Sequence, residues 1–305
     1  MRWVTKNAGT ATTGYLADHF YTMFTPPNWI KEYNHRYERL NDIPESAFKT
    51  VNDRLDKRNH GLPKVSILIA AWNEEVNIFN CVASLSALET TTPYEIIVIN
   101  NNSTDRTQET IDKLHVKSLF QPIQGCGPAR QLGQEHATGK YILLADADCI
   151  YPPCWLDKMT AALEKDGVVC VYGRYSFIPE SGYPRWKLYL LERMKDLIAE
   201  VRHFKRPYLN AYGISMGYVR ALGLKVGYVM YKVWGDDGRL CFDLMQYGKV
   251  KQVKSNKSRV WTSPRTLQRD GTFGKALISR IKIEFRRIGS MFTPHPPHDT
   301  KTSKN

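Results

Sequence analysis

The sequence lacks long apolar runs. No stretch of its 305 residues approaches the roughly 18–20 consecutive apolar positions that cross a membrane. The first residues, MRWVTKNAGTATTGY, also lack the apolar segment of a secretory signal. We therefore expect a cytoplasmic protein without a transmembrane helix.

Cysteine is scarce, and its spacing points to no metal site. The six cysteines form no CxxC pair and do not recur at the intervals of a zinc site. In a cytoplasmic chain this pattern predicts free and mostly buried thiols, rather than a disulfide framework.

Acidic residues are too few to balance the basic ones. Lys and Arg total 43 against 30 Asp and Glu, so the formal net charge is +13. The excess is greatest between residues 249 and 287. Nucleic acid, an anionic membrane surface or phosphorylated substrates would all fit such a charge. Because no zinc finger or RNA-recognition motif accompanies it, we expect no nucleic-acid partner.

Apolar residues make up 42% of the chain, which is enough to build a core. Short apolar runs alternate with helical patterns between residues 65 and 172. Strands are predicted at 65–71, 95–100, 116–120, 141–145 and 168–172, and helices at 74–88, 104–114, 128–137 and 152–165. This alternation is typical of an α/β fold with a mostly parallel sheet flanked by helices.

The pattern is weaker outside this block. Further helices are predicted at 45–56, 183–204, from 236 or 237 to about 248, and at 271–291. The predicted organisation is an N-terminal extension (1–62), a main domain (63–265, with halves 63–150 and 151–265) and a basic helical tail (266–305). The amphipathic tail helix could dock on an anionic membrane or cover the main domain, and its pattern favours the second.

Polar residues follow each of the first four predicted strands. In an open parallel sheet, ligands bind outside the carboxyl ends of the strands. These positions hold Trp72-Asn73-Glu74, Asn100-Asn101-Asn102, Gly125 to Arg130, and Asp146-Ala147-Asp148. The sequence therefore predicts a ligand site along one edge of the sheet.

Asp146 and Asp148 are the most informative pair at this edge. In an extended backbone, residues two apart point to the same side. Adjacent carboxylates repel each other unless a cation or hydrogen bonds compensate. Few protein ligands together with substrate phosphates suit Mg²⁺ or Mn²⁺. A surface turn with two aspartates is the alternative, and the position after a buried strand favours the metal.

Other residues at this edge allow two interpretations each. Trp72 could stack on a base or pack in the core. The amides of Asn100 and Asn101 could read a base or ribose, or form turns and helix caps. Arg130, early in a helix, could face a diphosphate or solvent.

Six segments in order resemble family 2 glycosyltransferases, which have the GT-A fold. They are VSILIAAWNEE (65–75), IVINNNSTDRT (97–107), GCGPARQLGQEHATGKYILLADAD (125–148), GISMGYVR (213–220), WGDD (234–237) and WTSPR (261–265). The resemblance covers about residues 63–265. It implies an inverting enzyme that moves a sugar from a nucleotide sugar, with UDP favoured over GDP, to a sugar or lipid-linked acceptor in cell-surface polysaccharide or glycolipid assembly. Such an enzyme would be cytoplasmic, with peripheral membrane contact as an option.

The resemblance also implies roles in donor binding. Ala70, Trp72 and Glu74 would line the nucleoside pocket. Asn101 stands where many members have the aspartate that binds the uracil edge. Because Asn100 and Asn101 replace two aspartates, and an amide tolerates several bases, the base is left open.

For catalysis, the resemblance implies that Asp148 holds Mn²⁺ or Mg²⁺ and that Asp146 supports the metal or contacts the ribose. Asp237 would be the general base, with Asp236 in place of the usual glutamate. The positive charge of Arg130 or Arg265 would help to neutralise the leaving diphosphate. The QxxRW motif of processive members is absent, so chain-extending synthase activity is not expected.

Two other classes stay open at this point. A nucleotidyltransferase of related fold would need a phosphate-binding loop rich in Gly, Arg and Lys after the first strand, and AAWNEE is not such a loop. A non-catalytic basic binding protein would suit the charge, but it has no need of Asp146, Asp148 and Asp237 at the ligand edge.

The aromatic-rich segment after Gly173 could line an acceptor site, although packing on the core is the favoured interpretation.

Overall fold

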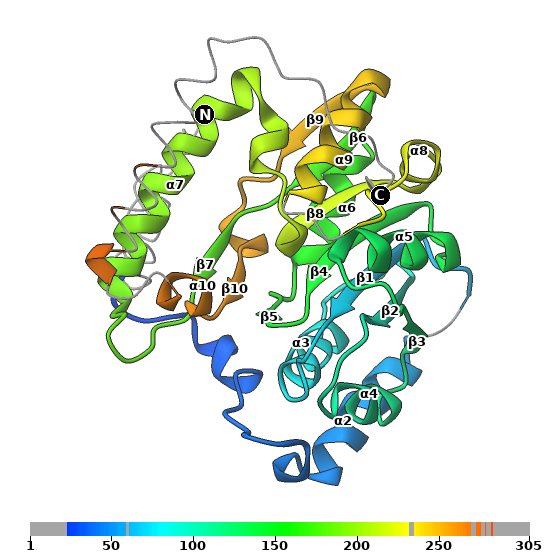
Figure 1. Cartoon of the computed structure of the whole chain (residues 1–305), viewed down its shortest axis with the longest axis vertical. Helices are drawn as coiled ribbons and strands as arrows, with labels where there is room; N and C mark the ends of the chain where they lie inside the picture. Colours follow the sequence, from blue (N-terminus) through cyan, green and yellow to red (C-terminus); the bar gives the residue numbers. More distant parts are fainter. Residues whose placement is uncertain are drawn as a thin grey trace, which may run out of the picture.

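The computed structural model describes residues 23–58, 61–231 and 235–269, together with 273–275, 278 and 282. A seven-stranded sheet in the order β3-β2-β1-β4-β8-β6-β9 lies at its centre, between helices (Figure 1). The strands are β1 (Val65–Ala71), β2 (Tyr94–Asn100), β3 (Lys117–Phe120), β4 (Tyr141–Asp146), β6 (Val168–Tyr172), β8 (Met216–Val219) and β9 (Lys249–Gln252). Only β8 within this sheet runs antiparallel to its neighbours, so the predicted mostly parallel α/β sheet is confirmed.

Helices cover both faces of the sheet because successive side chains of each strand point to opposite faces. In β1, Ile67 and Ile69 join one apolar cluster and Leu68 joins the other. The first cluster includes residues of α2 (Glu45–Asp56), α3 (Asn77–Ser86), α4 (Thr107–Asp112) and α6 (Trp155–Leu163). The second includes residues of α5 (Cys126–His136) and α9 (Asp236–Leu244), and α8 (Arg220–Val226) packs on it.

A second, three-stranded sheet stands beside the first. It consists of β5 (Cys149–Ile150), β10 (Val260–Thr262) and β7 (Tyr175–Phe177), with β10 in the middle. Thr262 of β10 pairs with Cys149 of β5. This pairing brings the residue before β5, Asp148, close to the short helix α10 (Arg265–Gln268) that follows β10.

The N-terminal extension packs on the main body. Phe48, Val51 and Leu55 of α2 are buried in the first cluster, and the Phe48 ring lies 4.9 Å from the ring of Phe79. Short 3-10 helices complete the described chain: η1 (Asn28–Glu32), η2 (Leu40–Asp42), η3 (Pro207–Asn210), η4 (Gly213–Ser215), η5 (Met245–Tyr247) and η6 (Asn256–Ser258). The predicted tail helix at 271–291 lies mostly outside the described residues.

The long helix α7 (Arg185–Lys205) lies at the side of the molecule, on the left in Figure 1. Five of its large apolar side chains are exposed: Trp186, Leu190, Leu197, Val201 and Phe204. Their spacing places them on one side of the helix. Within the part of the chain that the structure describes, every helix is too short or too polar to cross a membrane.

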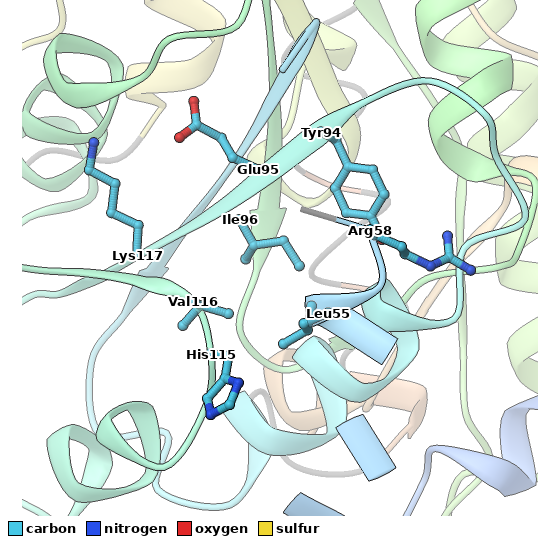
Figure 2. Close-up of a pocket in the computed structure, with 8 residues that line it drawn as sticks. All are labelled: Leu55, Arg58, Tyr94, Glu95, Ile96, His115, Val116 and Lys117. Carbon is cyan, nitrogen blue, oxygen red and sulfur yellow. The ribbon is translucent and has the colours of Figure 1, made fainter. Parts of the chain in front are cut away.

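A cavity of about 210 Å³ lies between α2 and the edge of the sheet (Figure 2). Its lining includes Tyr94 and Glu95, at the start of β2, and Lys117, at the start of β3. Because ligands of parallel sheets bind at the carboxyl ends of the strands, this cavity lies at the opposite end from the predicted site.

Candidate active site

Three neighbouring strands end side by side at the predicted ligand edge. Ala70 of β1 is in register with Asp146, the last residue of β4, and Ala71 is in register with Asn100, the last residue of β2. Parallel pairing thus brings the residues that follow the three strands to one place. Trp72, which follows Ala71 at the end of β1, is half exposed.

Arg130 is the buried centre of a charge cluster. Its Nη1 donates to Oδ2 of Asp236 at 2.9 Å and, closer still, to Oδ1 of Asp237. Its Nη2 donates to Oδ1 of Asp146 at 3.3 Å. The Arg130 side chain is 5% exposed. One guanidinium from α5 therefore joins the aspartate that ends β4 to the two aspartates that begin α9.

Three carboxylates around one cation leave negative charge uncompensated. Burial raises the pKa of Asp237 to about 7; Arg130 opposes this shift, and Asp236 and Asp146 add to it. Burial likewise raises the pKa of Asp146 to about 6, against Arg130 and with a contribution from Asp148. The cluster can therefore take up or release a proton near neutral pH.

Gly213 makes room for this cluster. A Cβ at this position would stand 1.8 Å from Nη2 of Arg130 and 3.2 Å from Oδ1 of Asp146. Its backbone N–H also donates to Oδ2 of Asp237 at 2.8 Å. Both carboxylate oxygens of Asp237 are thus held, which fixes the orientation of the side chain. Each oxygen still has a second lone pair for an incoming group.

Arg265 forms a second group with Asp148 and Glu74. Its Nη2 donates to Oδ2 of Asp148 at 2.7 Å and to Oε1 of Glu74 at 2.8 Å. The other carboxylate oxygen of Glu74 accepts a hydrogen bond from Asn77 at 2.6 Å. Burial raises the pKa of Glu74 in spite of the arginine. Glu74 and Arg265, which are 191 positions apart in the chain, thus meet at the ligand edge.

The backbone between Asp146 and Asp148 is not extended as expected. The strand β4 ends at Asp146, and Ala147 and Asp148 form a turn before β5. Asp146 therefore faces Arg130, whereas Asp148 faces Arg265. The extended backbone expected between them was wrong, but the two carboxylates are still close enough for Asp148 to raise the pKa of Asp146.

The donor atoms near Asp148 suit a hard divalent cation. Among the described residues, no three or more His, Cys, Asp or Glu side chains come together as a metal site. Mg²⁺ is commonly held by one or two carboxylates plus substrate phosphates, so a fuller protein shell is not required. The guanidinium of Arg265 already places a positive charge between Asp148 and Glu74. Asp148 and Glu74 thus already share one cation, and their carboxylate oxygens are ligands that suit Mn²⁺ or Mg²⁺.

Asn100 and Asn101 both have partners within the protein. The Asn100 amide donates to Gln108 at 2.8 Å, and its oxygen accepts from the N–H of Ser103. The Asn101 amide donates to the carbonyl of Ile123 at 2.8 Å, and its oxygen accepts from the N–H of Gly125. Through these bonds both side chains hold the loops after β2 and β3 in place. Their predicted contact with a base stays a prediction.

Comparison with known proteins gives the class of enzyme. The model of the family described as glycosyl transferase family 2 matches residues 66–223, just over half of the 305-residue chain. The chain belongs to glycosyl transferase family 2. Three classes were considered from the sequence: a glycosyltransferase, a nucleotidyltransferase and a non-catalytic binding protein. The family match supports the glycosyltransferase.

Individual relatives of this glycosyltransferase share shorter segments. The uncharacterized glycosyltransferase YibD of Escherichia coli (strain K12) is 39% identical over 109 residues, which are 34% of this chain and 31% of that protein. The chondroitin synthase of Pasteurella multocida (strain Pm70) is 26% identical over 218 residues, 66% of this chain and 22% of that protein. The matches thus span less than a third of the length of either relative.

Solved structures support the fold of the glycosyltransferase. The mannosyltransferase PcManGT from Pyrobaculum calidifontis, in complex with GDP-Man and Mn²⁺, superimposes with a TM-score of 0.51 at 14% identity, covering 92% of this chain and 79% of that one. GalNAc-T7 with UDP, GalNAc and Mn²⁺ also gives 0.51, at 21% identity and covering 67% and 44%. The expectation of a GT-A fold is confirmed.

Two sets of contacts at this edge could not be read from the sequence. Nothing in the segment GISMGYVR shows that the Gly213 N–H binds Asp237. Tyr151 is also involved, since its hydroxyl accepts from the N–H of Asp146 at 2.8 Å and donates to the carbonyl of Ile214. Such contacts depend on tertiary packing, and only the clustering of polar residues at strand ends could have indicated them.

Proposed function

We propose that this glycosyltransferase moves a sugar from a nucleotide sugar to an acceptor hydroxyl with inversion, using a divalent metal and Asp237 as the general base. The observation that carries the proposal is the shared contact of Arg130 with Asp146 and Asp237. It brings the candidate base next to the acidic turn that would face the donor diphosphate. The Mn²⁺ bound to the two structural relatives supports the metal.

These positions support the following reaction. Asp237 accepts the proton of the acceptor hydroxyl, and the oxygen attacks the anomeric carbon of the donor. The bond between that carbon and the diphosphate breaks, and the electron pair leaves with the nucleoside diphosphate. Attack opposite the leaving group inverts the anomeric configuration. Arg130 and the Gly213 N–H hold Asp237 in place for the proton transfer.

A metal at Asp148 would neutralise charge on the leaving diphosphate as a Lewis acid. Asp148 would hold it, with Asp146 nearby and Glu74 as a neighbouring carboxylate. Arg265, which now pairs with Asp148 and Glu74, would then be available to the phosphates. A UDP-sugar is the favoured donor and a GDP-sugar the alternative, since structural relatives hold one or the other nucleotide.

The acceptor is proposed to be a sugar or a lipid-linked sugar in the assembly of a cell-surface polysaccharide or glycolipid. The chondroitin synthase relative supports a polysaccharide. The test is release of nucleoside diphosphate from a panel of UDP- and GDP-sugars with Mn²⁺. Metal-dependent release from at least one donor is expected. No release across the panel, with or without sugar acceptors, would contradict the proposal.

Peripheral contact with the inner face of the membrane is part of this proposal. The exposed apolar side of α7 carries Leu197 and Phe204, 68% and 87% exposed, and Lys187 and Lys205 lie close to it in sequence. Apolar and basic groups together suit an anionic membrane surface.

Replacing Leu197 and Phe204 by aspartate should therefore weaken flotation with anionic vesicles at low salt. The matched control is Leu62→Asp, because Leu62 is 91% exposed but lies outside α7. Wild-type protein that does not float, or a double variant that floats as well as the control, would rule out this contact.

A further inference from the structure

A cavity of about 160 Å³ lies between α7 and the end of β6. Its lining includes Tyr172, Gly173 and Tyr175 from the β6–β7 segment and Lys195 from α7. The cavity is several times larger than the about 30 Å³ that one water occupies in the liquid. It therefore has room for a ligand group rather than a single buried water.

The cavity adjoins both charged groups of the active site. Tyr212 lines it and precedes Gly213, whose N–H binds Asp237. Thr266 also lines it and follows Arg265, which binds Asp148. A ligand in the cavity would thus touch the immediate neighbours of the residues that hold the proposed base and the proposed metal ligand.

Two polar side chains in the cavity wall lack hydrogen-bond partners. Within the described part of the chain, Nζ of Lys195 is buried without one, and so are both amide atoms of Gln252. Nζ of Lys195 instead lies 3.2 Å from the centre of the Tyr175 ring. Burial lowers the pKa of Lys195 to about 8. Leaving such groups unpaired is costly, so they are expected to meet a ligand.

The charge of the cavity wall indicates the kind of ligand. Arg174, Lys195 and Arg202 line the cavity with three positive charges, and Asp196 is its one lining carboxylate. Arg174 is also paired with Glu200, outside the lining, at 2.5 Å. The Asp196 carboxylate is already shared, since it also accepts from Arg259 at 2.5 Å. The wall is therefore positive overall and suits an anion. The rings of Tyr175 and Tyr212, 6.2 Å apart, offer apolar surface for a sugar.

We propose that this cavity is the acceptor subsite and selects an acceptor with a negatively charged group, a carboxylate or a phosphate, bound by Lys195 and the Gln252 amide. This inference rests on the proposed function. Lys195 would pair with the anion, the amide of Gln252 would donate to it, and the aromatic rings would contact the sugar that carries it.

Binding of small sugars to the full chain at pH 7, measured by calorimetry, tests the inference. The probes are methyl β-glucuronide, glucose 6-phosphate and neutral methyl β-glucoside. At least one anionic probe should bind about tenfold or more tightly than the neutral one. The better anion tells whether a carboxylate or a phosphate is recognised. Equal affinity for all three probes would overturn the proposal.

Lys195→Met should weaken the preferred anion about tenfold or more and leave the neutral probe unchanged. The matched control is Lys187→Met on the same helix, which does not line the cavity. Gln252→Leu gives a second variant, and both substitutions remove unpaired buried groups, so melting temperatures should stay equal or rise. Unchanged anion affinity in the folded variants would contradict the inference.

Donor binding separates this inference from the proposed function. The thermal shift caused by UDP or GDP with Mn²⁺ should persist in Lys195→Met and Gln252→Leu, because Asp237 is held by Arg130 and the Gly213 N–H, and Asp148 by Arg265. If the wild type shows no nucleotide shift, the proposed function fails. If the nucleotide shift persists and anions show no preference, only the acceptor inference fails.

Discussion

Asp237→Asn is expected to lower turnover by about 10²–10⁴-fold, while affinity for the donor stays within a few fold. Asparagine keeps the shape of the side chain and an oxygen that can accept from the Gly213 N–H. It removes the group that takes the proton of the acceptor. The fold should tolerate the change, because one of three carboxylates around a single guanidinium is lost.

The pH dependence gives a second readout of the same residue. Because burial raises the pKa of Asp237 to about 7, turnover should rise with pH through this region and level off above it. The value belongs to the whole cluster with Arg130, since its carboxylates titrate together. A base acts only when ionised, so activity is lost on the acid side.

The matched control for Asp237→Asn is Asp243→Asn, further along the same helix α9. Steady-state kinetics of nucleoside diphosphate release should show near wild-type turnover for the control. Full turnover in Asp237→Asn, with the same rise near pH 7 as wild type, would reject Asp237 as the general base.

Arg130→Met is expected to destabilise the protein by about 3–5 kcal/mol at neutral pH, since it leaves the largely buried carboxylates of Asp236 and Asp237 without their cation. Arg130 contacts Asp146, Asp236 and Asp237, and its side chain is almost fully buried. Urea unfolding measures the change. Arg106→Met is the control: Arg106 pairs with Glu109 on the surface, and such pairs contribute little.

The loss of stability in Arg130→Met should depend on pH. In the wild type, the pKa values of Asp146 and Asp237 are about 6 and 7, above the ordinary value near 3.9. The folded state therefore binds more protons than the unfolded state, and stability falls as pH rises through this window. Without the guanidinium this fall should steepen, so the variant loses more stability at pH 8 than at pH 5. An equal loss at both pH values would contradict the account.

The sequence predicted the strands β1, β2, β4 and β6 well, because they are buried on both faces. The runs VSILIAA and EIIVIN are continuous and apolar, and the structure places β1 and β2 there within one residue. The strands β8 (Met216–Val219, with a glycine) and β9 (Lys249–Gln252) were missed, since each is too short to show a pattern. The strands β5, β7 and β10 were also missed, because they have only two or three residues each.

The site was predicted in part. Strand ends could be read from the sequence, so Asp146 and Arg130 were named, and the family resemblance gave Asp237. Their shared contact could not be predicted, since Arg130 and Asp237 are 107 residues apart. The turn at Asp148 was also hidden, because two aspartates after a strand fit an extended chain equally well. Lys195 gave no signal, since a lysine on an amphipathic helix usually faces solvent.

The central claim is that Asp148 holds a divalent cation against the diphosphate of the donor. The most direct measurement is the thermal shift of the wild type and Asp148→Asn with UDP or GDP, in the presence and absence of Mn²⁺. The wild type should show a large shift only with nucleotide and Mn²⁺ together, and Asp148→Asn should lose the part that depends on Mn²⁺. A nucleotide shift that is the same with and without Mn²⁺, or one that Asp148→Asn leaves unchanged, would contradict the account.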